Sequence, residues 1–218
     1  MNVDFFTAAN TAARLGAIRT KNAVNGIREP GTNMNFNSRI NSMAVIKIIE
    51  DREFLKKKSR PVDKITAKTL QLLDDMRETL RSRDGCGLAA PQVGVLRRVI
   101  LIAPALPERE DENDVDVENE SDSEEPETDY IEMINPVVTE TSGEQQELEG
   151  CLSFPGQWGI TKRPMRVKVR ALDRTGTEFE FEGEALVARE ICHEIDHLDG
   201  ALFFDSCVRM VNRDELEM

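Results

Sequence analysis

The two histidines constrain the fold of this chain more than any other feature, because they can serve one site only if the segment between them is helical. His193 and His197 are the only histidines among the 218 residues. In an α-helix, positions i and i+4 lie on one face, so both imidazoles can reach one metal ion. Glu194 lies beside them, where a general base that activates water is needed. The spacing therefore predicts a helix over 184–198, capped by Gly200, in a metal-dependent hydrolase.

Composition fits one folded domain and places most of the negative charge in a single segment. A chain of 218 residues with 39% hydrophobic residues can build one core. The net charge is -13, yet thirteen of the 41 acidic residues lie between Glu108 and Asp129, beside one basic residue. Such a composition cannot form a core, so residues 107–129 are predicted to be a solvated loop inserted between strands. The acidity therefore says little about what the core binds.

The domain organisation follows from the same shifts in composition. Residues 1–42 are rich in Asn, Ala, Thr and Arg without periodicity, which predicts a disordered extension. They also fit an organellar transit peptide or an upstream start before Met43. The catalytic domain is expected over 43–205, followed by a short tail over 206–218. No apolar run is long enough to span a membrane and no signal peptide is evident, so we expect a cytoplasmic protein, with an organelle as the alternative.

Hydrophobic periodicity predicts two helices, several strands and an α+β fold. The first helix is expected over 61–83, and the second is the histidine helix. Strands are expected over 44–49, 98–103, 130–138, 165–172 and 177–182, the last two joined by a tight turn. In this order of elements, antiparallel strands pack around the C-terminal helix.

The two imidazoles leave a catalytic metal site one ligand short, because such sites use three protein ligands and one open position. Cys151 lies in the segment Glu-Gly-Cys-Leu-Ser, and a thiolate with two imidazoles suits zinc or ferrous iron. Its alternative role is that of a small buried apolar residue, the common fate of free cysteine. Glu215 and Glu217 are rival third ligands, although they lie near the chain end, where fraying is expected.

The segment 85–94 reads Gly-Cys-Gly-Leu-Ala-Ala-Pro-Gln-Val-Gly and is the third unusual stretch. It superficially fits a dinucleotide-binding fingerprint, but it follows a helix and contains a proline, which excludes that interpretation. Its glycines allow another chain to approach the backbone closely. Gln92 offers an amide donor that could stabilise an oxyanion. The alternative is a turn from helix to strand that carries no chemistry.

Taken together and in order, these three segments resemble the three motifs of the peptide deformylase family. The resemblance runs from about Met43 to Asp205 and implies that Cys151, His193 and His197 bind the metal, while Glu194 is the general base and acid. It further implies roles for residues around the reacting group. Gln92 and the backbone N–H of Leu152 would face the carbonyl, and Gly87 and Gly150 would line the groove for the substrate backbone, with Cys86 beside it.

The implied substrate is a nascent peptide that begins with N-formylmethionine, from which water releases formate. The implied cofactor is one Fe²⁺ ion, for which Ni²⁺, Co²⁺ or Zn²⁺ can substitute. The ribosome is a further candidate partner, although the tail after Asp205 is too short for the long helix with which some family members dock on it. Neither nucleic acid nor a membrane is expected as a direct partner.

The residues alone are also compatible with two other functions. A His-Glu-x-x-His endopeptidase would need a third ligand downstream and would gain nothing from residues 149–153. A silent binding protein on the same scaffold would have no need of the full catalytic set. One departure from the family pattern concerns specificity: Cys86 stands where Ile or Val is more frequent.

Overall fold

The computed structural model describes residues 43–83, 85–103 and 130–216. The predicted extension over 1–42, the acidic segment over 107–129 and the rival ligand Glu217 lie outside the described residues. Within the described ranges, the chain has no helix that is both long and apolar enough to span a membrane.

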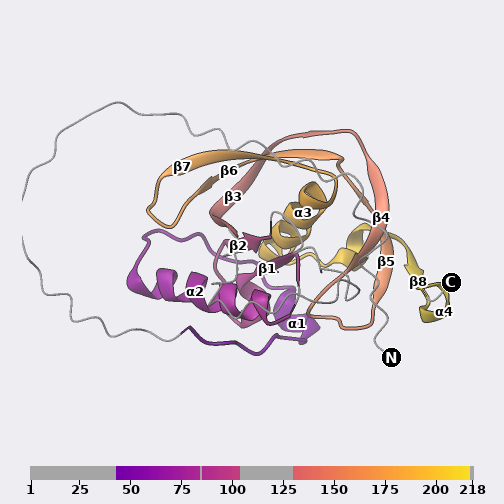
Figure 1. Ribbon diagram of the computed structural model, residues 1–218, viewed down its shortest axis with the longest axis horizontal. Helices are drawn as coiled ribbons and strands as arrows, with labels where there is room; N and C mark the ends of the chain where they lie inside the picture. The colour runs from indigo at the N-terminus through magenta and orange to yellow at the C-terminus, as the bar shows by residue number, and fades with distance from the viewer. Residues whose placement is uncertain (1–42, 84, 104–129, 217–218) are drawn as a thin grey trace, which may run out of the picture.

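Helices lie near both ends of the described chain, and the strands β2 to β7 follow one another between them (Figure 1). The helices are α1 (Arg52–Leu55), α2 (Ala67–Arg81), the short 3-10 helix η2 (Ala90–Val93), α3 (Leu186–Asp199), the 3-10 helix η3 (Phe203–Ser206) and α4 (Arg213–Leu216). The strands are β1 (Gly87–Ala89), β2 (Val99–Ile102), β3 (Ile131–Ser142), β4 (Gln145–Gly150), β5 (Trp158–Arg163), β6 (Arg166–Leu172), β7 (Glu178–Glu184) and β8 (Cys207–Val211).

The strands form two antiparallel sheets that enclose α3. The larger sheet has the order β1-β2-β3-β6-β7, and the smaller has the order β4-β5-β8. The chain passes from β3 in the first sheet to β4 in the second through a turn at Gly143, whose φ of 66° suits glycine. Figure 1 shows α3 beneath the long strands β3, β6 and β7 and beside β4 and β5. The predicted α+β fold, with antiparallel strands around the C-terminal helix, is confirmed.

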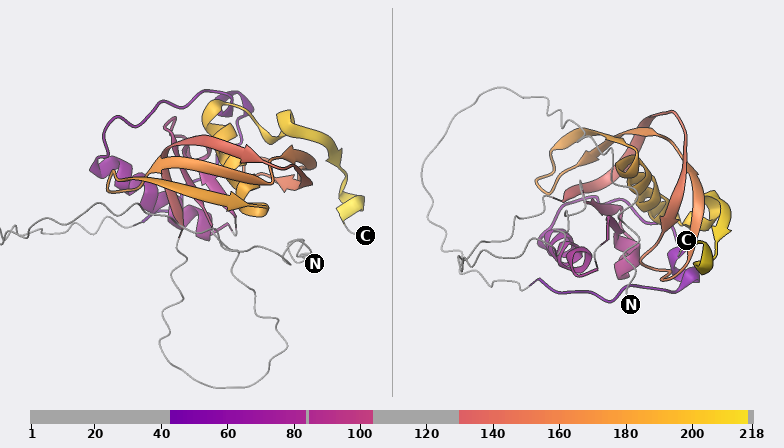
Figure 2. Two further views of the ribbon diagram at one scale, coloured as in Figure 1. Left: turned by 90° about the horizontal axis from the view of Figure 1, so that it is seen from above. Right: turned by 45° about the vertical axis from the view of Figure 1, so that its right-hand side comes forward.

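The core has two layers, one on each side of β1 and β2. In β2, Ile100 faces the cluster around α3, whereas Val99 and Leu101 face the cluster around α2, as the period of two along a strand requires. Figure 2 shows the two helices on different sides of these strands. On α3, the apolar residues Ala188, Ile191 and Leu198 recur at helical spacing and pack on the larger sheet. The opposite face of α3 is thereby left for the histidines.

Several predicted elements are confirmed with shifted ends, and one is wrong. The first helix begins only at Ala67, after its N-cap Thr66. Gly200 does cap α3, with a φ of 76°. Residues 44–49 form no strand: the Ile46 N–H donates to the Thr79 side chain and the Ile49 N–H to the Gln92 carbonyl. These are separate tethers to α2 and η2, not a strand ladder.

The start of α3 is fixed by a strained residue. Ala185 has φ 52° and ψ -118°, a conformation that residues with a side chain rarely adopt and that costs on the order of 1–3 kcal/mol. Its N–H donates to the Met165 carbonyl at 2.8 Å, and its carbonyl accepts from the Gln145 amide at 2.8 Å. These bonds tie the first turn of α3 to both sheets and so set where its histidines lie.

Candidate metal centre

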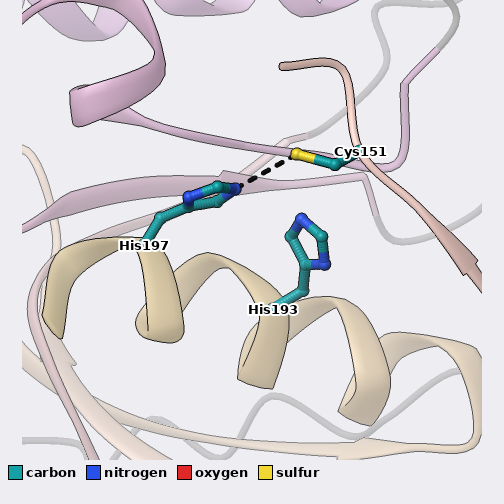
Figure 3. A group of neighbouring side chains, drawn as sticks. All are labelled: Cys151, His193 and His197. Atoms are coloured by element: carbon teal, nitrogen blue, oxygen red, sulfur yellow. Dashed lines mark hydrogen bonds between the residues drawn. The ribbon is translucent and has the colours of Figure 1, made fainter. Parts of the chain in front are cut away.

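Cys151, His193 and His197 come together on one side of α3 (Figure 3). Both imidazoles project from the same face of the helix toward Cys151, which follows β4. One ligand atom from each residue lies within 4.8 Å of the others, and His197 Nε2 is 3.3 Å from Cys151 Sγ. These separations fit three donors around one ion, since zinc lies about 2.3 Å from thiolate sulfur and about 2.0 Å from imidazole nitrogen. The donor set suits zinc or ferrous iron.

Glu215, the rival third ligand within the described residues, is engaged elsewhere. It lies on α4 and accepts a hydrogen bond from Arg209 at 2.7 Å and another from the Asn212 N–H at 3.1 Å. In the described part of the chain, the cluster around the histidines is completed by Cys151 and does not include Glu215.

A buried carboxylate orients His193. Glu149, which is 3% exposed, lies 2.6 Å from His193 Nδ1. An acceptor at this nitrogen selects the tautomer with Nδ1–H and leaves the lone pair of Nε2 available to bind a metal ion. Glu149 also accepts from Thr161 at 2.6 Å and from two nitrogens of the Arg163 guanidinium, Nη2 at 2.8 Å and Nε at 3.1 Å. Burial alone would raise the pKa of Glu149, but the hydrogen bonds from His193 and Arg163 lower it to about 2.

The same network continues to the next turn of α3. Arg163 donates to Asp196 at 2.5 Å, so its guanidinium connects β4, β5 and α3. His197 lies one residue further along and is 1% exposed. Burial, reinforced by the neighbouring His193, lowers the pKa of His197 to about 3. The ring therefore stays neutral, as a metal-binding imidazole must.

Glu194 faces the cavity with an oxygen that the protein leaves unpaired. It is 2% exposed, and its Oε2 has no hydrogen-bond partner among the described residues. Burial, with the nearby acidic groups Glu190 and Cys151, raises its pKa well above the ordinary range. A Cβ atom at Gly87 would lie 2.6 Å from Glu194 Oε1, so only glycine lets β1 pass this carboxylate. The arrangement suits a group that takes up and releases a proton.

Gln92 directs its side-chain amide N–H toward Cys151. Its Oε1 accepts from the Ala89 N–H at 2.8 Å, which leaves Nε2 facing Cys151 Sγ at 3.5 Å. Leu152 follows Cys151 in a turn that the Phe154 N–H closes on the Cys151 carbonyl at 2.9 Å. Both predicted oxyanion donors therefore lie beside Cys151.

A cavity of about 490 Å³ opens over this cluster. The predicted site residues that line it are Cys86, Gly87, Gln92, Gly150, Cys151, Leu152, His193 and Glu194. At Gly150 a Cβ atom would lie 2.6 Å from the Trp158 ring, so glycine is needed there as well. Burial, with Glu190 and Glu194 nearby, raises the pKa of Cys86 and keeps it a thiol. His197 belongs to the ligand cluster but not to this lining.

Four residues of this network, Glu149, Thr161, Arg163 and Asp196, were not predicted from the sequence to have a role. For Glu149 a signal existed, because an acidic residue two positions before a thiolate ligand in a strand can turn toward the site. For Arg163 there was none, since it reaches Glu149 only through the pairing of β5 with β4.

Comparison with known proteins gives one consistent family. Residues 44–213 match the model of the polypeptide deformylase family. The peptide deformylase of Caldicellulosiruptor bescii is 44% identical over 172 residues, which cover 79% of this chain and 90% of that protein. The peptide deformylase of Acetivibrio thermocellus is 47% identical over 176 residues, which cover 80% and 91% of the two chains.

Solved structures agree with this result. A peptide deformylase from Legionella pneumophila superposes with a TM-score of 0.61 at 35% identity, covering 80% of this chain and 90% of that one. A class I type b peptide deformylase from Acinetobacter baumannii with bound Met-Ala-Ser gives a TM-score of 0.62 at 32% identity, covering 76% and 99%. Both relatives share more than the fold with this chain, because their sequence identity extends over nearly their full length.

Proposed function

This chain belongs to the polypeptide deformylase family, and from that premise we propose how its own residues carry out the family's reaction. The protein is a metal-dependent hydrolase that removes the formyl group from the N-terminal formylmethionine of newly made polypeptides and releases formate. The observation that carries the assignment of roles is the convergence of one thiol and two imidazoles beneath a cavity that Glu194 also lines.

In this proposal Cys151, His193 and His197 hold the metal ion. The spacing of their donor atoms, the neutral state of His197 and the carboxylate of Glu149 behind His193 all support this role. When bound, a divalent metal makes water acidic enough to lose a proton near neutral pH and polarises the formyl carbonyl.

The remaining chemistry belongs to three groups of the protein. Glu194 accepts the proton of the attacking water and returns it to the amine that leaves, since its unpaired oxygen faces the cavity. The Gln92 amide and the Leu152 N–H donate hydrogen bonds to the formyl oxygen as negative charge develops on it. The products are formate and a free amino terminus.

The substrate backbone lies between β1 and β4, the edge strands of the two sheets, where Gly87 and Gly150 permit close approach. The relative with bound Met-Ala-Ser supports a peptide as the occupant of this groove. Nascent chains carry the formyl group as they leave the ribosome, so we place the enzyme in the cytoplasm, with the ribosome as its source of substrate.

Release of formate from formyl-Met-Ala-Ser tests the ligand assignment. We expect that Cys151→Ala abolishes both bound metal and turnover, because only two ligands remain. Glu215→Ala is the matched control and should leave both unchanged, since Glu215 pairs with Arg209 on α4. Metal analysis and circular dichroism of each purified variant accompany the assay. A folded Cys151→Ala protein with normal metal content would contradict the assignment.

The native metal in this proposal is Fe²⁺, with Ni²⁺, Co²⁺ or Zn²⁺ able to replace it, because the donor set suits all four. Exposure to oxygen distinguishes iron from the other three metals, because ferrous iron bound to a thiolate leaves both the metal and Cys151 open to oxidation. We expect the activity of iron-loaded protein to decay in air while nickel-loaded protein persists. Equal decay of the two preparations would argue against an iron enzyme.

A further inference from the structure

One surface of the molecule carries exposed basic residues without acidic partners. Residues 53–68, which lead from α1 into the first turn of α2, hold six lysines and arginines and two acidic residues. Among the described residues, none forms an ion pair or a side-chain hydrogen bond with Lys58, Arg60, Lys64 or Lys68, and all four are exposed. The nearby pair of Lys56 with Glu53, at 4.0 Å and in solvent, contributes little.

The larger sheet shows the opposite arrangement of charge. On β6, Arg166, Lys168 and Arg170 lie between 2.8 and 3.8 Å from glutamates on β7. The unpaired cations between α1 and α2 are therefore a local feature of a chain whose net charge is -13.

The backbone that carries these cations is held in place. The Ser59 N–H donates to the Leu198 carbonyl of α3 at 2.8 Å, and the Arg60 N–H donates to the Leu96 carbonyl at 3.2 Å. The Arg60 carbonyl accepts in turn from the Arg98 N–H at 3.0 Å. The cations therefore project from an ordered backbone, unlike the charge runs of a solvated tail.

Arg97 joins this surface from a distant part of the chain. It pairs with Arg60 in an isolated bridge between the two segments. Together with Lys64 and Lys68 it lines a cavity of about 560 Å³, separate from the one over the metal centre. We call the basic residues of this surface the basic ridge: Lys56, Lys57, Lys58, Arg60, Lys64, Lys68 and Arg97.

Helix stability explains the basic ridge at one end only. Cations near the C-terminal end of a helix stabilise its dipole, and the bond from Ser59 places Lys58 and Arg60 near the end of α3. The same rule makes Lys68 unfavourable, because it lies in the first turn of α2, which contains no acidic residue. An anion bound along the basic ridge would offset the charge at both ends.

The side chains of the basic ridge indicate what kind of anion it fits. Protein partners engage apolar and aromatic anchors at the centre of an interface, whereas contacts with phosphate use lysine and arginine. The large hydrophobic side chains that are well exposed among the described residues all lie outside the basic ridge: Met43, Val45, Val137, Val208 and Met210. The basic ridge therefore fits a phosphate backbone better than an acidic protein.

We infer that the basic ridge binds the phosphate backbone of structured RNA and does not read its sequence. RNA is chosen over DNA because newly made polypeptides are produced beside ribosomal RNA, and this choice rests on the proposed function. The net charge does not oppose binding, since thirteen of the 41 acidic residues lie in one segment, between Glu108 and Asp129. The inference departs from the expectation, drawn from the sequence, that nucleic acid is not a direct partner.

Fluorescence anisotropy of a short labelled RNA duplex, titrated with the metal-loaded full-length protein at several salt concentrations, tests the inference. We expect a Kd on the order of 10⁻⁶ to 10⁻⁴ M at physiological salt, with equal values for duplexes of unrelated sequence. The combined variant Lys58→Gln, Arg60→Gln and Lys64→Gln should bind about tenfold more weakly or worse. Its slope of log K against log salt should be shallower by about one for each residue replaced.

The matched control removes the same charge from the larger sheet. The combined variant Arg166→Gln, Lys168→Gln and Arg170→Gln should keep the affinity for RNA and the salt slope of the wild type, because these cations already face glutamates. Both variants should release formate from formyl-Met-Ala-Ser as the wild type does, and circular dichroism verifies their folding.

Absence of RNA binding by the wild type up to about 100 μM protein at physiological salt would overturn the inference. An equal loss of affinity in the two combined variants would also overturn it, since net charge alone would then account for binding. Tighter binding to polyglutamate or to phosphatidylserine vesicles than to RNA would replace RNA by an acidic protein or a membrane. A wild type that binds RNA but releases no formate would overturn the proposed function and leave the binding surface in place.

Discussion

Two buried glutamates lie at the candidate metal centre, and their hydrogen-bond partners and pKa values differ although both are buried. Glu149 is 3% exposed and Glu194 is 2% exposed. Glu149 accepts hydrogen bonds from Thr161, Arg163 and His193, and its pKa falls to about 2. Glu194 keeps one oxygen without a partner among the described residues, and its pKa rises well above the ordinary range. Burial penalises the charge of both groups, so the donors around each carboxylate decide which one stays ionised.

This difference in pKa suits the two glutamates to different roles: Glu149 to holding a metal ligand in place, and Glu194 to transferring a proton. A carboxylate that is permanently charged can hold the His193 ring in one tautomer and one orientation. A carboxyl group whose pKa is raised can exchange a proton with water and an amine near neutral pH. In the proposed mechanism, two residues of the same type therefore have different roles, because one lies against Arg163 and the other against Gly87.

The largest expected effect follows from removing the proton-transferring group alone. Glu194→Gln keeps the size of the side chain, so the neighbouring histidines should stay in place and retain the metal. Loss of general acid–base catalysis should lower kcat by roughly 100- to 10,000-fold. Single-turnover formate release and metal analysis on one preparation check this. A decrease below about tenfold would mean that Glu194, like Glu149, is a supporting residue.

A smaller decrease in kcat is expected when Glu194 is kept but its carboxylate is pushed out of place. In Gly87→Ala, the new Cβ atom would meet Glu194 Oε1 at 2.6 Å and Cγ at 2.9 Å, so the carboxylate must move. A misplacement of about 1 Å can cost up to about 100-fold in rate. We expect kcat to fall by about tenfold or more while metal content is kept. Gly176→Ala, in the turn between β6 and β7, is a control for a glycine substitution away from the site; unchanged kcat in Gly87→Ala would show that Glu194 tolerates displacement.

The sequence predicted the elements whose side chains alternate between apolar and polar at a regular period. The helix that became α3 and the pair β6 and β7 carry such a pattern, and β2 was predicted from its unbroken run of apolar residues. The smaller sheet was not predicted. β4 reads Gln-Gln-Glu-Leu-Glu-Gly, and its buried Gln145 and Glu149 are held by hydrogen bonds that no hydrophobic period can reveal.

The candidate site was predicted more fully than the fold, because its residues lie in three short segments with distinctive chemistry. The sequence predicts Cys151, His193 and His197 as ligands and Glu194 as the general base without any knowledge of their geometry. What the sequence could not predict was the environment of each group. The role of Glu149 depends on Arg163, fourteen residues away in a different strand, and only the pairing of β4 with β5 brings the two together.

The same substitution at both glutamates tests their division of roles most directly. Glu149→Gln and Glu194→Gln are compared by competition of each variant with a chelator for the metal under anaerobic conditions. We expect Glu149→Gln to bind the metal about 10- to 100-fold more weakly, because His193 loses its charged partner. Glu194→Gln should bind it as the wild type does. Equal metal affinities in the two variants, or a weaker affinity in Glu194→Gln, would contradict the assignment of one carboxylate to support and the other to reaction.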